Sequence, residues 1–197
     1  MKKIGLLIFM MICLNQVIHS QITQEQLDRA KQEAQNATDS KKEKEKIYEA
    51  LLDSAMTQNA IAAIEERNFV LEADKVTFKR GNWKYVSANT NFISLSGDNA
   101  TVQIAFDGAP PGPNGIGGIT LDGLASNVEV KKDKKGNIQF SMNVTGAGIS
   151  AIIEIEVTHG SNNAMATVTP NFSSNRFTLT GALYPTSESS VFKGRSL

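Results

Sequence analysis

The sequence predicts a mainly β protein with an N-terminal helical segment, in which eight or nine antiparallel strands form a barrel or a sandwich. Up to Arg67, apolar residues recur at helical steps of three and four, and from Asn68 onward they alternate with polar residues. The junctions between the alternating runs are short, so they can join antiparallel neighbours but cannot hold crossover helices. A sheet with one apolar face must hide it, which requires a sandwich or a closed barrel.

The first 20 residues have the pattern of a secretory signal peptide. Lys2 and Lys3 precede an apolar run from Ile4 to Leu14, and polar or small residues follow at Asn15, Gln16 and Ser20. The run is shorter than the roughly 20 residues that a membrane-spanning helix needs. We therefore expect removal of residues 1–20 and a mature protein in the periplasm or outside the cell, without a stable membrane span.

Residues 21–67 are predicted to form the helical segment. Thr23 and Gln26 have the spacing of a capping box at the start of a helix. Two apolar stripes follow at helical spacing: Leu27, Ala30, Ala34 and Ala37, then Ile47, Leu51, Ala55, Ile61 and Ala62. The second stripe can pack against the protein's own sheet or against a partner, and the sequence leaves both alternatives open.

Residues 68–197 are predicted to form the antiparallel β domain. One connection in it, Gly108–Gly118, is far longer than a hairpin needs. Long loops on a rigid β scaffold often carry function, although such a loop can also simply close one end of a barrel. We therefore take the following residues of this loop and its flank as candidate ligand-binding residues: Asn114, Gly115, Gly117, Gly118 and Asp122.

Few side chains suited to catalysis remain once the signal peptide is removed. Cys13 and His19 are lost with it, which leaves His159 as the one histidine, in a position typical of a surface turn. Glu154 and Glu156 lie on one face of a predicted strand, about 7 Å apart, a separation found in glycoside hydrolases. Their alternation with apolar residues is also that of an ordinary solvated face. We therefore expect no catalytic residues, no metal site and no cofactor.

The charge balance excludes some classes of partner. The chain carries 20 basic and 20 acidic side chains, and removal of the signal peptide leaves it close to neutral. Nucleic acids and anionic lipids as main partners select a strong basic excess, so neither is expected. An envelope protein, or a small hydrophobic ligand if the β domain has an open apolar mouth, remains a possible partner.

Several stretches of the β domain resemble a known family. The chain is similar to secreted Bacteroidetes proteins of domain-of-unknown-function family 4251 in FVLEADKVTFKRG (69–81), NTNFISLSGD (89–98), PNGIGGITLDG (113–123), KKGNIQFSMNVTGAGISA (134–151), TPNFSSNRFTLTGALYP (169–185) and VFKGRSL (191–197). The resemblance implies an exported or envelope protein of a Gram-negative bacterium and assigns no site residue. It also draws attention to the final stretch, in which we expect Phe192 to pack into the body of the protein.

The combined expectation is an exported, non-catalytic envelope or periplasmic protein that acts as a binding or scaffolding module. Two alternatives stand beside it. One is an assembly protein that docks through its N-terminal helix, and the other is a carboxylate-dependent hydrolase that uses Glu154 and Glu156.

Overall fold

The computed structural model describes residues 28–29 and 41–197. The predicted signal peptide, the capping box and the first apolar stripe lie outside these residues. The chain divides into two compact units, Met1–Ala55 and Met56–Leu197. The second unit contains the β domain and the last turns of the helix that precedes it.

The described elements consist of one long helix, nine strands and two short 3₁₀ turns. In chain order they are α2 (Lys41–Glu65), β1 (Asn68–Phe78), β2 (Trp83–Tyr85), η1 (Ala88–Thr90), β3 (Phe92–Ser96), β4 (Asn99–Ala105), β5 (Gly118–Lys132), β6 (Ile138–Gly146), β7 (Ile149–Val157), β8 (Asn163–Pro170), β9 (Phe177–Pro185) and η2 (Thr186–Glu188). No helix in the described part of the chain is long and apolar enough to span a membrane.

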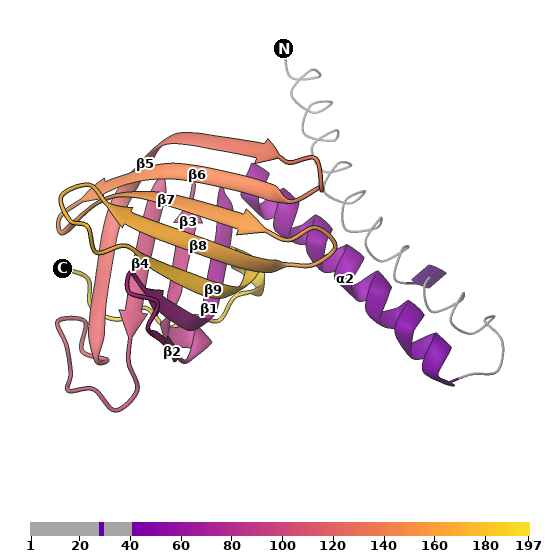
Figure 1. Cartoon of the computed structure of the whole chain (residues 1–197), viewed down its shortest axis with the longest axis horizontal. Helices are drawn as coiled ribbons and strands as arrows, with labels where there is room; N and C mark the ends of the chain where they lie inside the picture. Colours follow the sequence, from indigo (N-terminus) through magenta and orange to yellow (C-terminus); the bar gives the residue numbers. More distant parts are fainter. Residues whose placement is uncertain (1–27, 30–40) are drawn as a thin grey trace, which may run out of the picture. The chain divides into compact units, whose positions relative to one another are not determined.

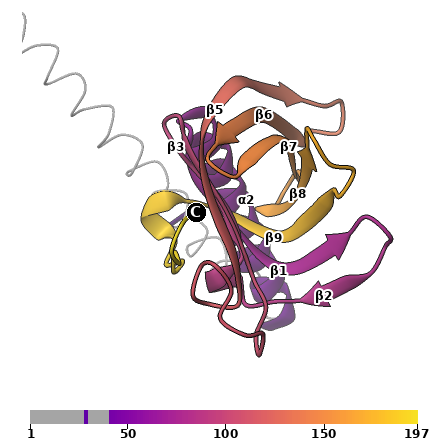
Figure 2. The ribbon, with the colours of Figure 1, turned by 90° about the vertical axis from the view of Figure 1, so that its left-hand side faces the viewer.

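The strands form one antiparallel sheet that closes on itself (Figure 1). Their order is β2-β1-β3-β4-β5-β6-β7-β8-β9, and β9 pairs again with β1 from Phe69↔Pro185 to Phe78↔Phe177. Eight strands thus complete a barrel, while β2 extends β1 as a short ribbon (Figure 2). The predicted antiparallel meander is confirmed, and of the two architectures that the sequence left open the structure has the barrel.

β1 pairs with three other strands because it is long and irregular. Its first half pairs with β3 from Asn68 to Glu72, its second half pairs with β2 from Lys75 to Thr77, and its other edge pairs with β9. The register against β9 shifts between Ala73 and Lys75. A bulge of this kind bends a strand and increases its twist, which lets one strand follow the barrel wall and then leave it.

Large apolar side chains from the strands fill the interior of the barrel. The rings of Phe69 and Phe140 meet edge to face with centroids 5.2 Å apart. The largest fully buried side chains of this core on the strands are Phe69, Leu71, Ile93, Leu95, Phe140, Met142, Ile153, Ile155, Leu179 and Leu183. The alternation predicted from the sequence is confirmed in β7, where every second residue from Ile149 to Val157 is buried.

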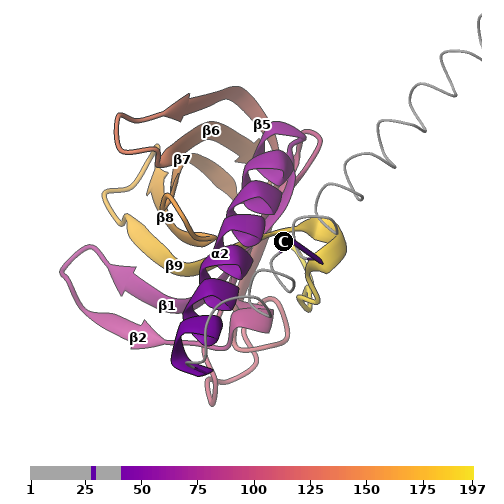
Figure 3. The same cartoon turned by 90° about the vertical axis from the view of Figure 1, so that its right-hand side faces the viewer.

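The last turns of α2 lead into β1 and contribute to the same core (Figure 3). Ala60, Ala63 and Ile64 are buried there, while Ile61 and Ala62 of the predicted stripe are only half-buried. Ile61 packs against this core, so the predicted stripe located the helix face only in part: it included Ala62 and missed Ala60, Ala63 and Ile64. Small residues at the contact let a helix backbone approach the strands closely.

We expect Phe140→Ala to lower the free energy of unfolding by about 3–5 kcal/mol, because it removes a buried ring and leaves a cavity. Urea denaturation followed by circular dichroism measures this change. Phe172→Ala is the matched control: Phe172 is 92% exposed, so its loss should change stability by no more than about 0.5 kcal/mol. Equal effects of the two substitutions would contradict the packed interior.

Candidate functional site

Asn114 organises the long loop between β4 and β5. Its side-chain oxygen accepts hydrogen bonds from the backbone N–H groups of Ile116 (3.1 Å) and Gly118 (3.0 Å), and Asn114 itself is buried. These two donors fix the orientation of the amide. Its side-chain NH₂ has no hydrogen-bond partner among the described residues. Asn114 therefore closes the loop onto the start of β5.

The glycines predicted as ligand contacts have backbone roles in this loop. Gly115 and Gly117 have φ angles of 78° and 86°, a region that glycine enters without strain. At Gly118, a Cβ atom would collide with the carbonyl oxygen of Ile104 on β4. The close approach that the sequence suggested at this position is therefore made by the protein's own neighbouring strand.

Asp122 lies on β5, where it is half exposed and holds the last residues of the chain. One carboxylate oxygen accepts a hydrogen bond from Thr101 on β4 (2.6 Å), and the other accepts bonds from Lys193 and Ser196 (both 2.7 Å). Partial burial acts to raise the pKa of the Asp122 carboxyl. The hydrogen bonds and the positive charge of Lys193 outweigh burial and hold this pKa below its ordinary value.

Residues 189–197, here called the C-terminal strap, run across the outer face of the barrel. Ser189 donates a hydrogen bond to Glu72 on β1 (2.6 Å), and the backbone N–H of Leu197 reaches the carbonyl of Thr120 on β5 (3.1 Å). Between these ends, the backbone N–H of Arg195 donates to the carbonyl of Asn114 (3.0 Å). The strap therefore covers the same region in which the sequence placed its candidate site.

Gln103 on β4 is the central anchor of the C-terminal strap. It is fully buried, and its side-chain NH₂ donates to the carbonyls of Thr90 (2.9 Å) and Phe192 (2.8 Å). Its side-chain oxygen accepts from the Thr120 hydroxyl (2.7 Å) and the Gly194 N–H (2.8 Å). All four hydrogen-bonding positions of the amide are thus used.

Phe192 is held by its backbone and not by its ring. Its N–H donates to the carbonyl of Asn89 (2.7 Å) and its carbonyl accepts from Gln103, while the side chain is 59% exposed. The expectation that Phe192 packs into the body was therefore wrong. A buried polar amide, not an apolar ring, fastens the strap.

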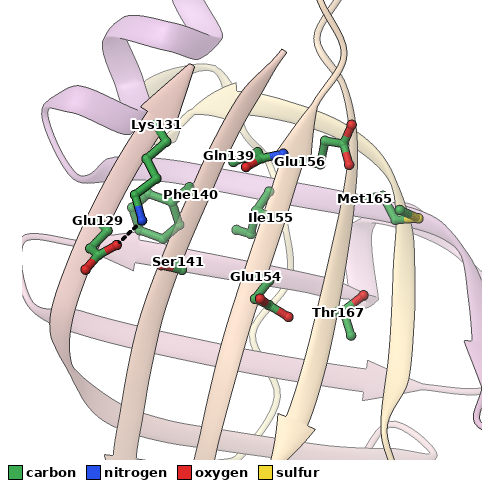
Figure 4. Close-up of a pocket in the computed structure, with 10 residues that line it drawn as sticks. All are labelled: Glu129, Lys131, Gln139, Phe140, Ser141, Glu154, Ile155, Glu156, Met165 and Thr167. Carbon is green, nitrogen blue, oxygen red and sulfur yellow. Dashed lines mark hydrogen bonds and ion pairs between the residues drawn. The ribbon is translucent and has the colours of Figure 1, made fainter. Parts of the chain in front are cut away.

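A second feature is a groove on the outer face of β5, β6, β7 and β8 (Figure 4). It has a volume of about 370 Å³, and side chains of four neighbouring strands project into it. Most of its lining is polar: Glu129, Lys131, Gln139, Phe140, Ser141, Glu154, Ile155, Glu156, Met165 and Thr167. Both carboxylates of the predicted pair, Glu154 and Glu156, are exposed in it.

Some of the groove side chains are paired with each other and others are not. Lys131 contacts Glu129 at 2.6 Å, and its hydrogen bond is the main cause that lowers the pKa of the Glu129 carboxyl. Glu156 accepts a hydrogen bond from Asn137 at 3.3 Å. Gln139, Ser141 and Glu154 make no side-chain hydrogen bond within the described part of the chain. These donors and acceptors are therefore available to a polar ligand.

Sequence reasoning missed the groove and the strap for different reasons. Alternation identifies Gln139 and Glu154 as outward-facing, but it does not show that side chains of β5, β6, β7 and β8 line one groove, which depends on the order of the strands in the sheet. The strap could have been suspected from Gln103, a polar residue between Val102 and Ile104 in an apolar strand. His159, by contrast, lies exposed in the turn after β7, the type of position predicted for it.

Comparison with known proteins gives a family match and a similar solved structure. A model of the family described as domain of unknown function DUF4251 matches residues 52–183. The chain is similar to the crystal structure of a DUF4251 family protein from Bacteroides eggerthii DSM 20697, with 46% sequence identity and a TM-score of 0.63. That similarity covers 75% of this chain and 99% of the other. No curated protein matches the chain.

We expect Gln103→Leu to free the C-terminal strap and to lower the free energy of unfolding by about 3 kcal/mol, since buried partners of the amide lose their hydrogen bonds. Trypsin cleavage after Lys193 and Arg195, followed by mass spectrometry, reports on the strap directly. Gln139→Leu makes the same chemical change at an exposed position and should leave cleavage unchanged. Unaltered cleavage in Gln103→Leu would show that the amide does not hold the strap.

Asp122→Asn should remove a contribution to stability that depends on pH. The folded-state pKa of Asp122 lies below the unfolded value of about 3.9, so its contribution is fully present above that pH. The contribution is lost as the pH falls from about 4 through the folded pKa. The stability difference between wild type and variant should therefore shrink over this range in urea denaturation. A stability difference that stays constant over this pH range would contradict the contribution of Asp122.

Proposed function

The chain belongs to the DUF4251 family, as its sequence predicted, and we propose that it is an exported, non-catalytic binding or scaffolding module of a Gram-negative cell envelope. Export is supported by the signal-peptide pattern of residues 1–20. The similar protein from a Bacteroides species is consistent with the same cellular setting. Without residues 1–20 the chain has no cysteine and one histidine, which supports a role without catalysis.

The observation that carries the binding role is a contrast between the two faces of the barrel sheet. Side chains fill the interior of the barrel, whereas the outer face carries a groove. Phe69, Phe140 and Met142 are among the large side chains that occupy the interior. The groove on β5–β8 offers about 370 Å³ of space lined by donors and acceptors. We therefore assign binding to this groove and propose a polar ligand or a polar segment of an envelope protein as its occupant, in preference to a small hydrophobic ligand inside the barrel.

The geometry of the carboxylates favours binding over hydrolysis. Glu154 and Glu156 are exposed and stand beside Ser141, Thr167, Gln139 and Met165 of the adjacent strands. Both carboxylates lie on one solvated surface and are not enclosed in a cleft, which suits hydrogen bonding to a bound partner.

An assembly role for the N-terminal helix is the second candidate, and one observation favours it. In the part of α2 that belongs to the first unit, Ile47, Leu51 and Ala55 are only half-buried and Tyr48 is 41% exposed. Apolar positions that stay incompletely covered on a helix are common at protein–protein contacts. This helix would then dock another envelope protein while the barrel serves as the body.

Site-specific photo-crosslinking in the source bacterium separates the two candidates. We expect a photoreactive residue at Glu154 to give an adduct of defined mass, because the groove would hold the partner. A reactive residue at Tyr48 gives the main adduct if α2 docks instead. Asn99, which is exposed at the start of β4, is the control. Adducts at none of the positions, or equally at all three, would contradict both candidates.

The same purified material tests export. N-terminal sequencing should find a chain that begins close to residue 21 in the envelope or periplasmic fraction. A cytosolic pool that retains Met1 would contradict export even if the groove binds a partner.

A further inference from the structure

Two turns of the barrel form a common surface. The β1–β2 turn (residues 79–82) and the β8–β9 turn (residues 171–176) adjoin each other, because Phe78 at the end of β1 pairs with Phe177 at the start of β9. Figure 2 shows the β1–β2 hairpin reaching outward beside β9. A cavity of about 440 Å³ lies between the turns and is lined by Phe78, Lys79, Arg80, Asn82, Asn175, Arg176 and Phe177.

The charged side chains of this surface are all basic. Among the described residues that line the cavity, Lys79, Arg80 and Arg176 are cationic and none is acidic. None of the three makes an ion pair within the described part of the chain. From Lys75 to Ser87 and from Asn163 to Pro185, the sequence carries five basic and no acidic side chains. A chain that is neutral in total therefore gathers uncompensated positive charge on two neighbouring hairpins.

Exposed aromatic side chains stand on the same two hairpins. Phe172, in the β8–β9 turn, is 92% exposed, and Trp83 and Tyr85 on β2 are 55% and 69% exposed. The Trp83 and Tyr85 rings meet edge to face at 5.0 Å, with the Lys75 ammonium 5.2 Å from the Trp83 ring centre. Large apolar rings this exposed in a soluble domain mark a contact surface.

Cations and aromatic rings on one edge fit an anionic bilayer better than a dissolved anion. A free phosphate would engage Lys79, Arg80 and Arg176 but would leave Phe172 and Trp83 in water. In a lipid interface, the cations meet phosphate groups while aromatic rings enter the boundary between head groups and acyl chains. The cationic and aromatic side chains then both contribute to binding, because they contact the lipid surface at the same time.

We propose that this basic aromatic edge, made of Lys79, Arg80, Trp83, Phe172 and Arg176, docks the protein on an anionic phospholipid surface. The cations bind the lipid phosphates, and Phe172 and Trp83 insert at the interface. The edge is separate from the groove on β5–β8, so the inference goes beyond the proposed binding role and does not depend on what occupies the groove.

Vesicle co-sedimentation of the purified protein tests the proposal. We expect binding to vesicles of phosphatidylglycerol and phosphatidylcholine in equal parts, weakening as salt is added, and no binding to phosphatidylcholine alone. The triple variant Lys79→Ser, Arg80→Ser and Arg176→Ser should lower partitioning at least tenfold, since each cation near an anionic surface changes it by roughly fivefold. If the triple variant fails to fold by circular dichroism, Arg176→Ser alone should still give a several-fold loss.

A matched control distinguishes the effect of the edge on vesicle binding from the effect of total charge. Lys132→Ser, Lys134→Ser and Lys135→Ser remove the same charge from exposed positions around the β5–β6 turn and should leave vesicle binding unchanged. Equal losses in the two triple variants would overturn the proposal, since a specific edge would not be involved.

Phe172→Ser separates lipid from dissolved phosphate. We expect this variant to lose vesicle binding at least fivefold while it binds inorganic phosphate as the wild type does, measured by calorimetry. Binding of inorganic phosphate without any binding to anionic vesicles would overturn the proposal and identify a site for a dissolved anion instead. Binding to neutral vesicles equal to that on anionic ones would also overturn it.

Discussion

The pairing of β9 with β1 is the constraint on which the rest of this structure depends. It runs from Phe69↔Pro185 to Phe78↔Phe177 and turns an open meander into a barrel. In a closed barrel, every strand has one face toward the interior and one toward the outside, so its residues alternate between core and surface. Closure also removes most of the exposed sheet edge, which an open sheet would offer to other chains. The buried core and the adjoining β1–β2 and β8–β9 turns follow from this one junction.

The outer face of β4 shows how a polar side chain can organise a surface. Ala100 and Val102 of this strand face the core, while Thr101 and Gln103 face outward and are nevertheless buried. The C-terminal strap covers them and supplies their hydrogen-bond partners. A buried amide without hydrogen-bond partners lowers the stability of the folded state. The four hydrogen bonds of Gln103 therefore restrict the path of the strap more than an apolar contact would. The region that the sequence marked as a candidate ligand site is thus partly occupied by the protein's own chain.

A filled barrel restricts where function can lie. Interior volume is taken by side chains such as Phe140 and Ile153, so chemistry and recognition are left to the outer surface. That surface is divided into a polar groove on β5–β8 and a basic aromatic edge on the hairpins next to β9. The two differ in charge and in apolar character, and they suit different partners. The proposed docking on lipid and the proposed binding of a partner therefore use separate surfaces of the barrel.

The sequence by itself determined the antiparallel meander, because strand alternation and short turns are local properties that each segment carries alone. It also predicted the family and the solvent-facing positions of Glu154 and His159. Only the tertiary structure decided that the sheet closes, that Ala60 and Ile64 are buried in the core next to Ile61, and that Phe192 stays exposed. The cations of the basic aromatic edge lie about a hundred positions apart and become neighbours only through the β1–β9 pairing. Such proximity depends on closure of the whole barrel, which no local pattern of residues contains.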